Sequence, residues 1–406
     1  MATFAALAGL LDGRTPKIYR GTSARSLPPE QTWARVQSLL RPCGITRVAN
    51  ITGLDRVGLP VYQAIRPNSR SLSVSQGKGA DAVAARVSAV MEAIELHFAE
   101  GPRLPLRLAT CSELQEEGLV ADPEELPHTP AHDPARRMLW TRGFELMSRQ
   151  PVWVPFDLVH VNLTEPAGSL LVTSNGLASG NTFTEAVFHG LCEVVERDAE
   201  ALFRLQSPEA QNRALLDLQA VTDPEVRRLL QRLAEAGLTA IAWNLTSDIA
   251  LPAVRVFLHD SHADSLVNPV SAPYGAGCHF DAVTALIRAL TESAQTRVSW
   301  IAGSRDDLSR DHYRRSHANT AYLTELLRLP TPARLDTLPR RELPTLEEDV
   351  EHVLSALRAV GIRQVAVVPL SEPDCPVAIA RVIVPGLEGP ALQERQLGRR
   401  ARAVLS

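Results

Sequence analysis

Lysine is almost absent from this chain of 406 residues. Only Lys17 and Lys78 occur, although lysine and arginine together number 42. Aromatic residues make up 5%, and no apolar run approaches the roughly 18 residues of a membrane-spanning helix. The net charge is −4, and neither a basic stripe nor a polybasic segment stands out. We therefore expect neither general nucleic-acid binding nor attachment to a membrane.

The cysteines are few and scattered. Five occur, an odd number, and no two form a CxxC pair. This spacing indicates neither a disulfide framework nor a zinc site. Reduced thiols in the cytoplasm are the expected state. The phosphate-binding motif GxxxxGK[ST] is also absent, which excludes a P-loop nucleotide site.

The order of predicted elements favours an α+β fold. Strands pair as hairpins beside helices, so mixed and antiparallel sheets are expected rather than a doubly wound parallel sheet. A helix and a strand are predicted in residues 1–60, which form an N-terminal extension. Residues 303–345 are rich in Arg, Asp and Pro and are predicted to be irregular, and residues 391–406 form a polar tail.

A glycine-rich turn followed by an acidic helix occurs three times. At 100° per residue, each helix places its polar residues on one stripe, about 60° to 80° wide. Most neighbouring positions are apolar, so these helices are predicted to be largely buried. The stripes hold Ser88, Glu92 and Glu95 on the first helix, Glu185, Glu193 and Glu196 with Arg197 at the margin on the second, and Arg288, Glu292 and Gln295 on the third.

Buried carboxylates in such numbers need a compensating cation, because like charges in a low dielectric repel strongly. Mg²⁺ is suited to this, since it takes oxygen ligands and shares them with phosphates. Lys78 and Arg197 would then face the phosphates, helped by backbone N–H groups of the glycine-rich turns. The sequence thus predicts a site for a magnesium-bound nucleotide. The competing interpretation is that the acidic stripes are ordinary solvated helix faces.

Two segments carry a family resemblance. "SQGKGADAVAARVSAVMEAIE" and "SNGLASGNTFTEAVFHGLCEVVERDAEALF" resemble the signature segments of the YcaO family. "AVTALIRALTESAQTR", followed by "GSRDDL", resembles a later segment of that family. The resemblance covers roughly residues 45–390, and residues 61–390 are assigned to a YcaO catalytic domain.

The resemblance implies an ATP- and Mg²⁺-dependent enzyme that phosphorylates the oxygen of a peptide backbone amide. It implies nucleotide contacts for Lys78, Ser88 and Glu92, and for a further group that would hold the phosphates or the nucleoside: Asn181, Arg197, Arg288 and Gln295. Metal or phosphate-shell ligands would be Glu95, Glu185, Glu193, Glu196 and Glu292, with Glu185 also counted among the nucleotide contacts. Glu95, Glu193 and Arg197 are the expected catalytic residues.

Two segments, one near each end of the region of resemblance, suggest which subgroup of the family the chain is similar to. The run "GITRVANITGLDRVGLPVYQAIRPNSRSLSVSQGKG" and the later "VIVPGLEGP" resemble members that work beside a TfuA-like partner and form thioamides with a sulfide donor. The proline-rich tail of many azoline-forming members is missing. The peptide or protein substrate stays open, as do azoline formation from Cys, Ser or Thr, a non-catalytic ATP-binding scaffold and a homodimeric state.

Overall fold

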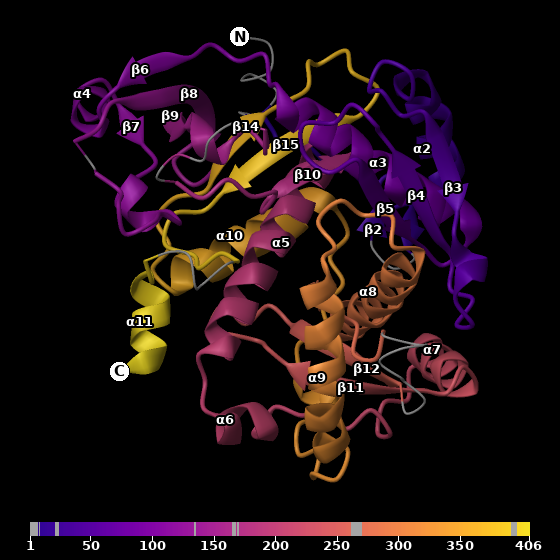
Figure 1. Ribbon diagram of the computed structural model, residues 1–406. Helices are drawn as coiled ribbons and strands as arrows, with labels where there is room; N and C mark the ends of the chain where they lie inside the picture. Colours follow the sequence, from indigo (N-terminus) through magenta and orange to yellow (C-terminus); the bar gives the residue numbers. More distant parts are fainter. Residues whose placement is uncertain are drawn as a thin grey trace.

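The computed structural model describes residues 7, 9–20, 24–133, 135–164, 168, 170–260, 270–390 and 396–406. Helices and antiparallel or mixed sheets alternate through the chain, which confirms the α+β fold. The three acidic helices each follow a glycine-containing strand, and these three strand–helix units organise the molecule (Figure 1). None of the helices in the described part of the chain has the length and apolar character needed to span a bilayer.

The first unit is an antiparallel sheet of β3 (Arg47–Asn50), β4 (Val61–Ile65) and β5 (Val74–Lys78), followed by α3 (Ala82–Glu100). Asp81 caps α3 by accepting hydrogen bonds from two backbone N–H groups of the first turn. The helix then lies on the sheet, against β4 and β5. β3 precedes residue 60 and β4 follows it, yet the two strands pair in one sheet. The boundary between an N-terminal extension and a catalytic domain at residue 60 stays a prediction.

The third unit repeats this arrangement. β11 (Leu238–Asn244), β12 (Ala253–Asp260) and β13 (Tyr274–Cys278) form an antiparallel sheet, and α8 (Ala282–Ala302) lies on β12 and β13. Asp281 caps α8 through the backbone N–H of Thr284. Two sheets with the same strand order therefore each present one acidic helix.

The middle unit belongs to a seven-stranded sheet in which, among the described strand pairs, only β7 and β9 are parallel. Its strands are β6 (Arg107–Ala109), β7 (Leu119–Val120), β8 (Met138–Glu145), β9 (Gln150–Pro155), β10 (Leu177–Gly180), β14 (Ala366–Pro369) and β15 (Ala378–Ile383). The second acidic helix, α5 (Phe183–Arg204), packs on β10 and β15 and runs through the centre of Figure 1.

Contacts between the units close a ring. α3 contacts β10, α5 contacts β13, and α8 contacts β5, so each acidic helix touches the strand of another unit in cyclic order. The apolar residues of each helix pack into the cores below. The polar stripes are thereby left facing one shared space.

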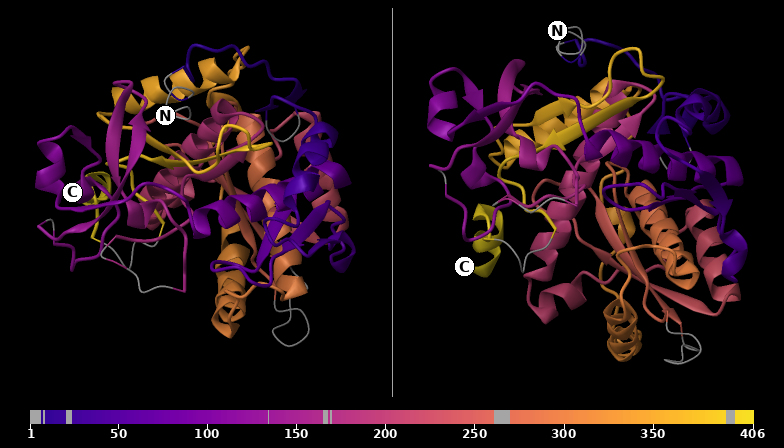
Figure 2. Two further views of the ribbon diagram at one scale, coloured as in Figure 1. Left: turned by 90° about the horizontal axis from the view of Figure 1, so that it is seen from above. Right: turned by 45° about the horizontal axis from the view of Figure 1, so that its top comes forward.

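Other elements surround this ring. The remaining strands are β1 (Tyr19–Arg20) and β2 (Ala24–Arg25). The other α-helices of the described residues are α2 (Pro29–Val36), α4 (Cys111–Gln115), α6 (Pro208–Arg213), α7 (Pro224–Glu235), α9 (Arg310–Leu326), α10 (Leu346–Ala359) and α11 (Arg399–Leu405). In Figure 2, α9 projects from the lower edge of both views.

The prediction that residues 303–345 are irregular was wrong. α9 lies within residues 303–345, where only Ser316, Leu323 and Leu326 of the helix are buried, so its apolar periodicity is too sparse to be seen in the sequence. The polar tail ends in α11, because Arg400 is buried against the carboxylates of Asp198 and Asp248. Ion pairing therefore holds an element that hydropathy alone does not predict.

Candidate functional site

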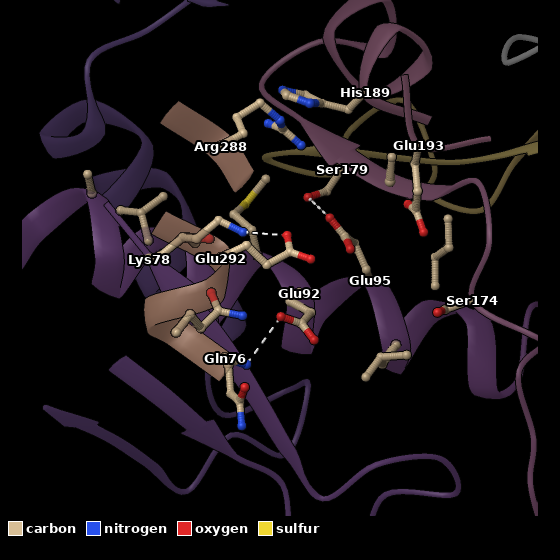
Figure 3. A pocket seen from close by; sticks show the side chains of 18 of the residues that line it. Gln76, Lys78, Glu92, Glu95, Ser174, Ser179, His189, Glu193, Arg288 and Glu292 are labelled. Carbon is tan, nitrogen blue, oxygen red and sulfur yellow. Dashed lines mark hydrogen bonds and ion pairs between the residues drawn. The ribbon is translucent and has the colours of Figure 1, made fainter. Parts of the chain in front are cut away.

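The three polar stripes face one pocket of about 520 Å³. Every site residue predicted from the sequence lines it, which places these side chains within one hollow rather than on separate solvated faces. They are Lys78, Ser88, Glu92, Glu95, Asn181, Glu185, Glu193, Glu196, Arg197, Arg288, Glu292 and Gln295. Figure 3 shows several of them pointing toward one another from β5, α3, α5 and α8.

Lys78 bridges two of the units. Its ammonium group lies 2.7 Å from a carboxylate oxygen of Glu292 on α8 (Figure 3). Burial alone would raise the pKa of Glu292, but Lys78, Arg197 and Arg288 hold it below its ordinary value. A compact ammonium on a flexible stem suits this position, and it can also reach a phosphate oxygen.

Four other carboxyl groups have raised pKa values, and burial is the main cause for each. The pKa of Glu95 is raised to about 8, those of Glu92 and Glu196 to about 7, and that of Glu193 to about 6. Neighbouring carboxylates add to the effect on Glu95, while a hydrogen bond from the Ser179 hydroxyl opposes it. In the empty pocket, the neighbouring positive charges therefore do not fully offset the burial of these four carboxyl groups.

The donors fit magnesium shared with a nucleotide. Within the described ranges, no three His, Cys, Asp or Glu side chains are already gathered as a metal cluster. Mg²⁺ commonly takes one or two carboxylates and completes its shell with phosphate oxygens and water. Hard carboxylate oxygens on opposite walls of one hollow match that pattern.

Two arginines of the predicted polar stripes add positive charge to the pocket. Arg197 donates a hydrogen bond of 2.8 Å to Glu200 and lies 3.5 Å from Glu196. The Nε of Arg288 is buried and has no hydrogen-bond partner among the described residues. A buried donor without a partner is costly, so a bound anion at Arg288 would relieve that cost.

Glu185 is held differently from the other carboxylates. It accepts hydrogen bonds from the backbone N–H and hydroxyl of Ser26, from Arg25, and from the side chain of Asn181. These donors keep its pKa below the ordinary value although burial acts in the opposite direction. Its predicted role as a metal ligand stays a prediction, and ligation would require some of these bonds to be replaced.

Sequence reasoning missed several residues of the pocket. Arg25, Gln76, Ser179 and Arg305 line it, but none belongs to a polar helix stripe. His189 of α5, which is not among the predicted site residues, also lines the pocket and lies near Arg288 (Figure 3). Burial lowers its pKa well below the ordinary value, so the imidazole is neutral at physiological pH.

The raised pKa of Glu95 predicts how stability changes with pH. An acid whose pKa is higher in the folded state stabilises the fold fully below its unfolded pKa of 4.5, and this contribution is lost as the pH rises through about 8. Glu95→Gln resembles the protonated acid. We expect this variant to match the nucleotide-free parent near pH 4.5 and to exceed its free energy of unfolding by at least about 1 kcal/mol near pH 8.5.

Urea denaturation at both pH values measures the difference. The exposed residue Glu116 provides the control, since Glu116→Gln should leave the pH profile unchanged. A Glu95→Gln variant that is less stable than the parent at the higher pH would contradict the expectation.

Comparison with known proteins agrees with this geometry. Residues 76–388 match the family described as YcaO cyclodehydratase, ATP- and Mg²⁺-binding. An uncharacterized protein encoded in the region 3′ of tfuA in Rhizobium leguminosarum bv. trifolii is 39% identical over 388 residues, which is 93% of this chain and 92% of that protein. An uncharacterized protein of Methanothermobacter thermautotrophicus is 34% identical over 390 residues, 93% of this chain and 99% of that protein.

Solved structures show the same fold. YcaO from Methanopyrus kandleri, bound with AMPPCP and Mg²⁺, superposes with a TM-score of 0.77 at 25% identity and covers 95% of this chain and 98% of that chain. A heterocyclase in complex with substrate and cofactor also gives a TM-score of 0.77, at 22% identity, over 96% of this chain and 56% of that chain. The chain therefore belongs to the YcaO family of ATP- and Mg²⁺-binding proteins.

Proposed function

We propose that this ATP-dependent enzyme converts a backbone amide of a peptide or protein into a thioamide. The amide oxygen attacks the γ-phosphorus of ATP, the bond to the ADP oxygen breaks, and the amide loses its N–H proton to solvent as it becomes a phosphorylated imidate. Hydrosulfide from a sulfide donor then adds to the former amide carbon. Its proton passes to the nitrogen, and phosphate leaves as the C–O bond breaks, so an oxygen is exchanged for a sulfur.

The charge distribution of the pocket is the observation that carries this proposal. Lys78, Arg197 and Arg288 would bind the phosphates from β5, α5 and α8, and transfer of a phosphoryl group depends mainly on such positioning and charge stabilisation. The carboxylates that would hold magnesium are Glu95, Glu193, Glu196 and Glu292. Bound magnesium would neutralise negative charge on the transferring phosphoryl group.

The chain supplies no nucleophile in this scheme. Burial raises the pKa of the Cys192 thiol to about 12 and that of Cys278 well above its ordinary value, so neither is a thiolate at neutral pH. All five cysteines are free, which accords with the proposed cytoplasmic location. The attacking sulfur would come from outside the protein.

The thioamide branch and the partner rest on one relative. The Rhizobium protein that is 39% identical over 93% of this chain is encoded in the region 3′ of tfuA. Proteins that act on the same substrate are often encoded together, so a TfuA-like partner would present the substrate or deliver sulfide. Assembly as a homodimer is compatible with this scheme.

A second candidate function is azoline formation. It is favoured by the description of the family as cyclodehydratases and by the likeness in fold to a heterocyclase. The first step would be the same phosphorylation, but a neighbouring Cys, Ser or Thr side chain would attack the amide carbon. A scaffold that only binds ATP is the remaining alternative.

Mass spectrometry distinguishes the three. The purified protein, a TfuA-like protein, a candidate peptide, Mg-ATP and sulfide are incubated, and the peptide mass is measured. We expect a gain equal to sulfur minus oxygen, accompanied by release of phosphate. Loss of one water from the peptide would establish azoline formation instead, and ATP binding without phosphate release would indicate a scaffold.

A further inference from the structure

A second cavity, of about 220 Å³, lies beyond the C-terminal half of α5. We call it the aromatic pocket. Its lining residues come from α5, α6, two neighbouring strands and α9: Phe203, Gln211, Trp243, Arg255, Phe257, Asn319, Tyr322 and Leu323. The cavity is smaller than the roughly 300–1,000 Å³ of typical cofactor or drug sites, so its size suits one side chain.

The aromatic pocket is lined by two residues with a buried N–H donor that forms no hydrogen bond to the described residues, and one of them, Arg255, is ion-paired with Glu200. The indole N–H of Trp243 and the Nε of Arg255 have no hydrogen-bond partner in the described part of the chain, and Trp243 is only 3% exposed. The guanidinium of Arg255 lies 4.8 Å and 4.7 Å from the ring centroids of Phe257 and Tyr274. Buried donors of this kind are costly unless an acceptor reaches them.

Most of the remaining lining is apolar or aromatic, with Gln211 and Asn319 as its polar members. Phe203 and Leu323 are buried, whereas Tyr322 is 46% exposed at the edge formed by α9. Asn319, one turn earlier on that helix, is also exposed. A ligand entering past α9 would therefore find an apolar wall and, deeper, two N–H donors.

Two connections join the aromatic pocket to the nucleotide pocket. On α5, Glu200 accepts a hydrogen bond of 2.8 Å from Arg197 and lies 4.0 Å from Nε of Arg255. On β13, Tyr274 is two residues from Ala276, whose N–H lies 3.5 Å from a carboxylate oxygen of Glu292. The aromatic pocket thus adjoins the side of the nucleotide pocket where Arg197 lies.

We propose that the aromatic pocket holds one aromatic side chain of the peptide substrate, close to the amide that is modified. The ring would pack against Phe203, Phe257 and Tyr322, where offset or edge-to-face contacts add to the burial of apolar area. A backbone carbonyl of the same residue would accept from Trp243 and Arg255. This inference rests on the proposed function, since it assigns a specificity site to that reaction.

The chemistry of the lining favours this occupant. A wholly apolar side chain without its backbone would leave the N–H of Trp243 without a hydrogen bond, and a free anion would gain nothing from the aromatic wall. A residue with an aromatic ring and a carbonyl satisfies both parts of the cavity. Selection of such a residue would also help to hold its neighbouring amide near the bound nucleotide.

Ligand-observed saturation-transfer NMR tests the site with N-acetyl-L-phenylalaninamide as the probe and N-acetylglycinamide as the ring-less comparison. Asn319→Trp should fill the cavity from an exposed position, and Tyr322→Ala should remove one wall. The matched control is Ala318→Trp, which adds the same bulk at a neighbouring exposed position that does not line the cavity.

We expect the parent and Ala318→Trp to bind the phenylalanine probe, and both pocket variants to bind it at least about tenfold more weakly, the effect of losing the burial of one aromatic side chain. Equal binding of both probes to the parent, or undiminished binding to Asn319→Trp, would overturn the proposal.

Thermal stabilisation by Mg-AMPPCP, measured on the same samples, separates this inference from the proposed function. Stabilisation without binding of the phenylalanine probe refutes the aromatic pocket as a substrate site and leaves amide activation intact. The opposite result is that the pocket variants bind the phenylalanine probe more weakly than the parent, while Mg-AMPPCP stabilises none of the samples. It would support the aromatic pocket and count against ATP-dependent activation.

Discussion

Replacing Glu193 with glutamine is expected to lower the rate of ATP-dependent amide activation by about 10³-fold. Glutamine keeps the size and one oxygen of the side chain but cannot carry the negative charge that a magnesium ligand needs. Loss of one preorganised electrostatic group in an active site commonly costs 10² to 10³ in rate, about 3 to 4 kcal/mol. Since Glu193 would hold the metal that neutralises charge on the transferring phosphoryl group, we expect a loss at the upper end of that range.

The environment of Glu193 predicts that the fold survives this change. Burial raises its pKa to about 6, with Arg197 and Arg381 acting in the opposite direction. The folded protein therefore already tolerates the neutral form of this side chain, and glutamine should not lower the free energy of unfolding. Reduced activity in Glu193→Gln would then reflect chemistry rather than unfolding.

Release of phosphate in the presence of substrate measures the rate, and urea denaturation measures stability. Glu235→Gln on α7 is the control, since Glu235 is exposed and does not line the pocket. Its rate should equal that of the parent. Removal of a single oxyanion-hole donor already lowers a rate by about 10² to 10³. If Glu193→Gln retained more than about a tenth of the parent rate, Glu193 would therefore not be a ligand of the catalytic metal.

Local periodicity was enough to predict the polar stripes. Glu92 and Glu95 face one side of α3 because helix geometry fixes the positions of residues three and four apart. The sequence could predict that Lys78 lies near phosphates or carboxylates, but not that its partner is Glu292, because 214 residues separate the two. The cyclic contacts that bring three helices together depend on the packing of whole sheets, which periodicity does not encode.

The environment of Glu185 shows where sequence reasoning fails. Its stripe position matches that of the other acidic residues, yet Arg25 and Ser26 reach it from the N-terminal segment and satisfy its oxygens. The sequence of α5 gives no sign of these two partners, because they lie about 160 residues earlier in the chain. An acidic stripe therefore predicts which residues share a pocket, but not which carboxylates remain available to a ligand.

The glycines ahead of each helix were interpreted as phosphate-binding turns, and the structure gives them a packing role. A Cβ added to Gly275 would lie 2.6 Å from Cβ of Glu292, and one added to Gly277 would lie 2.7 Å from Cβ of Arg288. A Cβ on Gly180 would lie 2.7 Å from Cβ of Glu185. Glycine in these strands lets each acidic helix lie close on its own strand.

Gly77→Ala is accordingly expected to destabilise the protein by at least about 3 kcal/mol, the upper range for inserting bulk into a packed interior. The added methyl group would meet the backbone N of Ala89 and O of Ala85, and would lie 2.6 Å from the carbonyl carbon of Ser88. These atoms belong to the backbone of α3 and cannot rotate away as a side chain could. The helix must therefore move off β5.

Gly53→Ala is the matched control, because a Cβ at Gly53 meets no atom within 4 Å. Urea denaturation should show its free energy of unfolding within about 0.5 kcal/mol of the parent. In Gly77→Ala the displacement of α3 carries Glu92 and Glu95 with it, so stabilisation by Mg-AMPPCP should also decline in whatever protein still folds. A Gly77→Ala protein as stable as Gly53→Ala would show that α3 does not depend on this close approach, and the nucleotide pocket would then need another explanation for its shape.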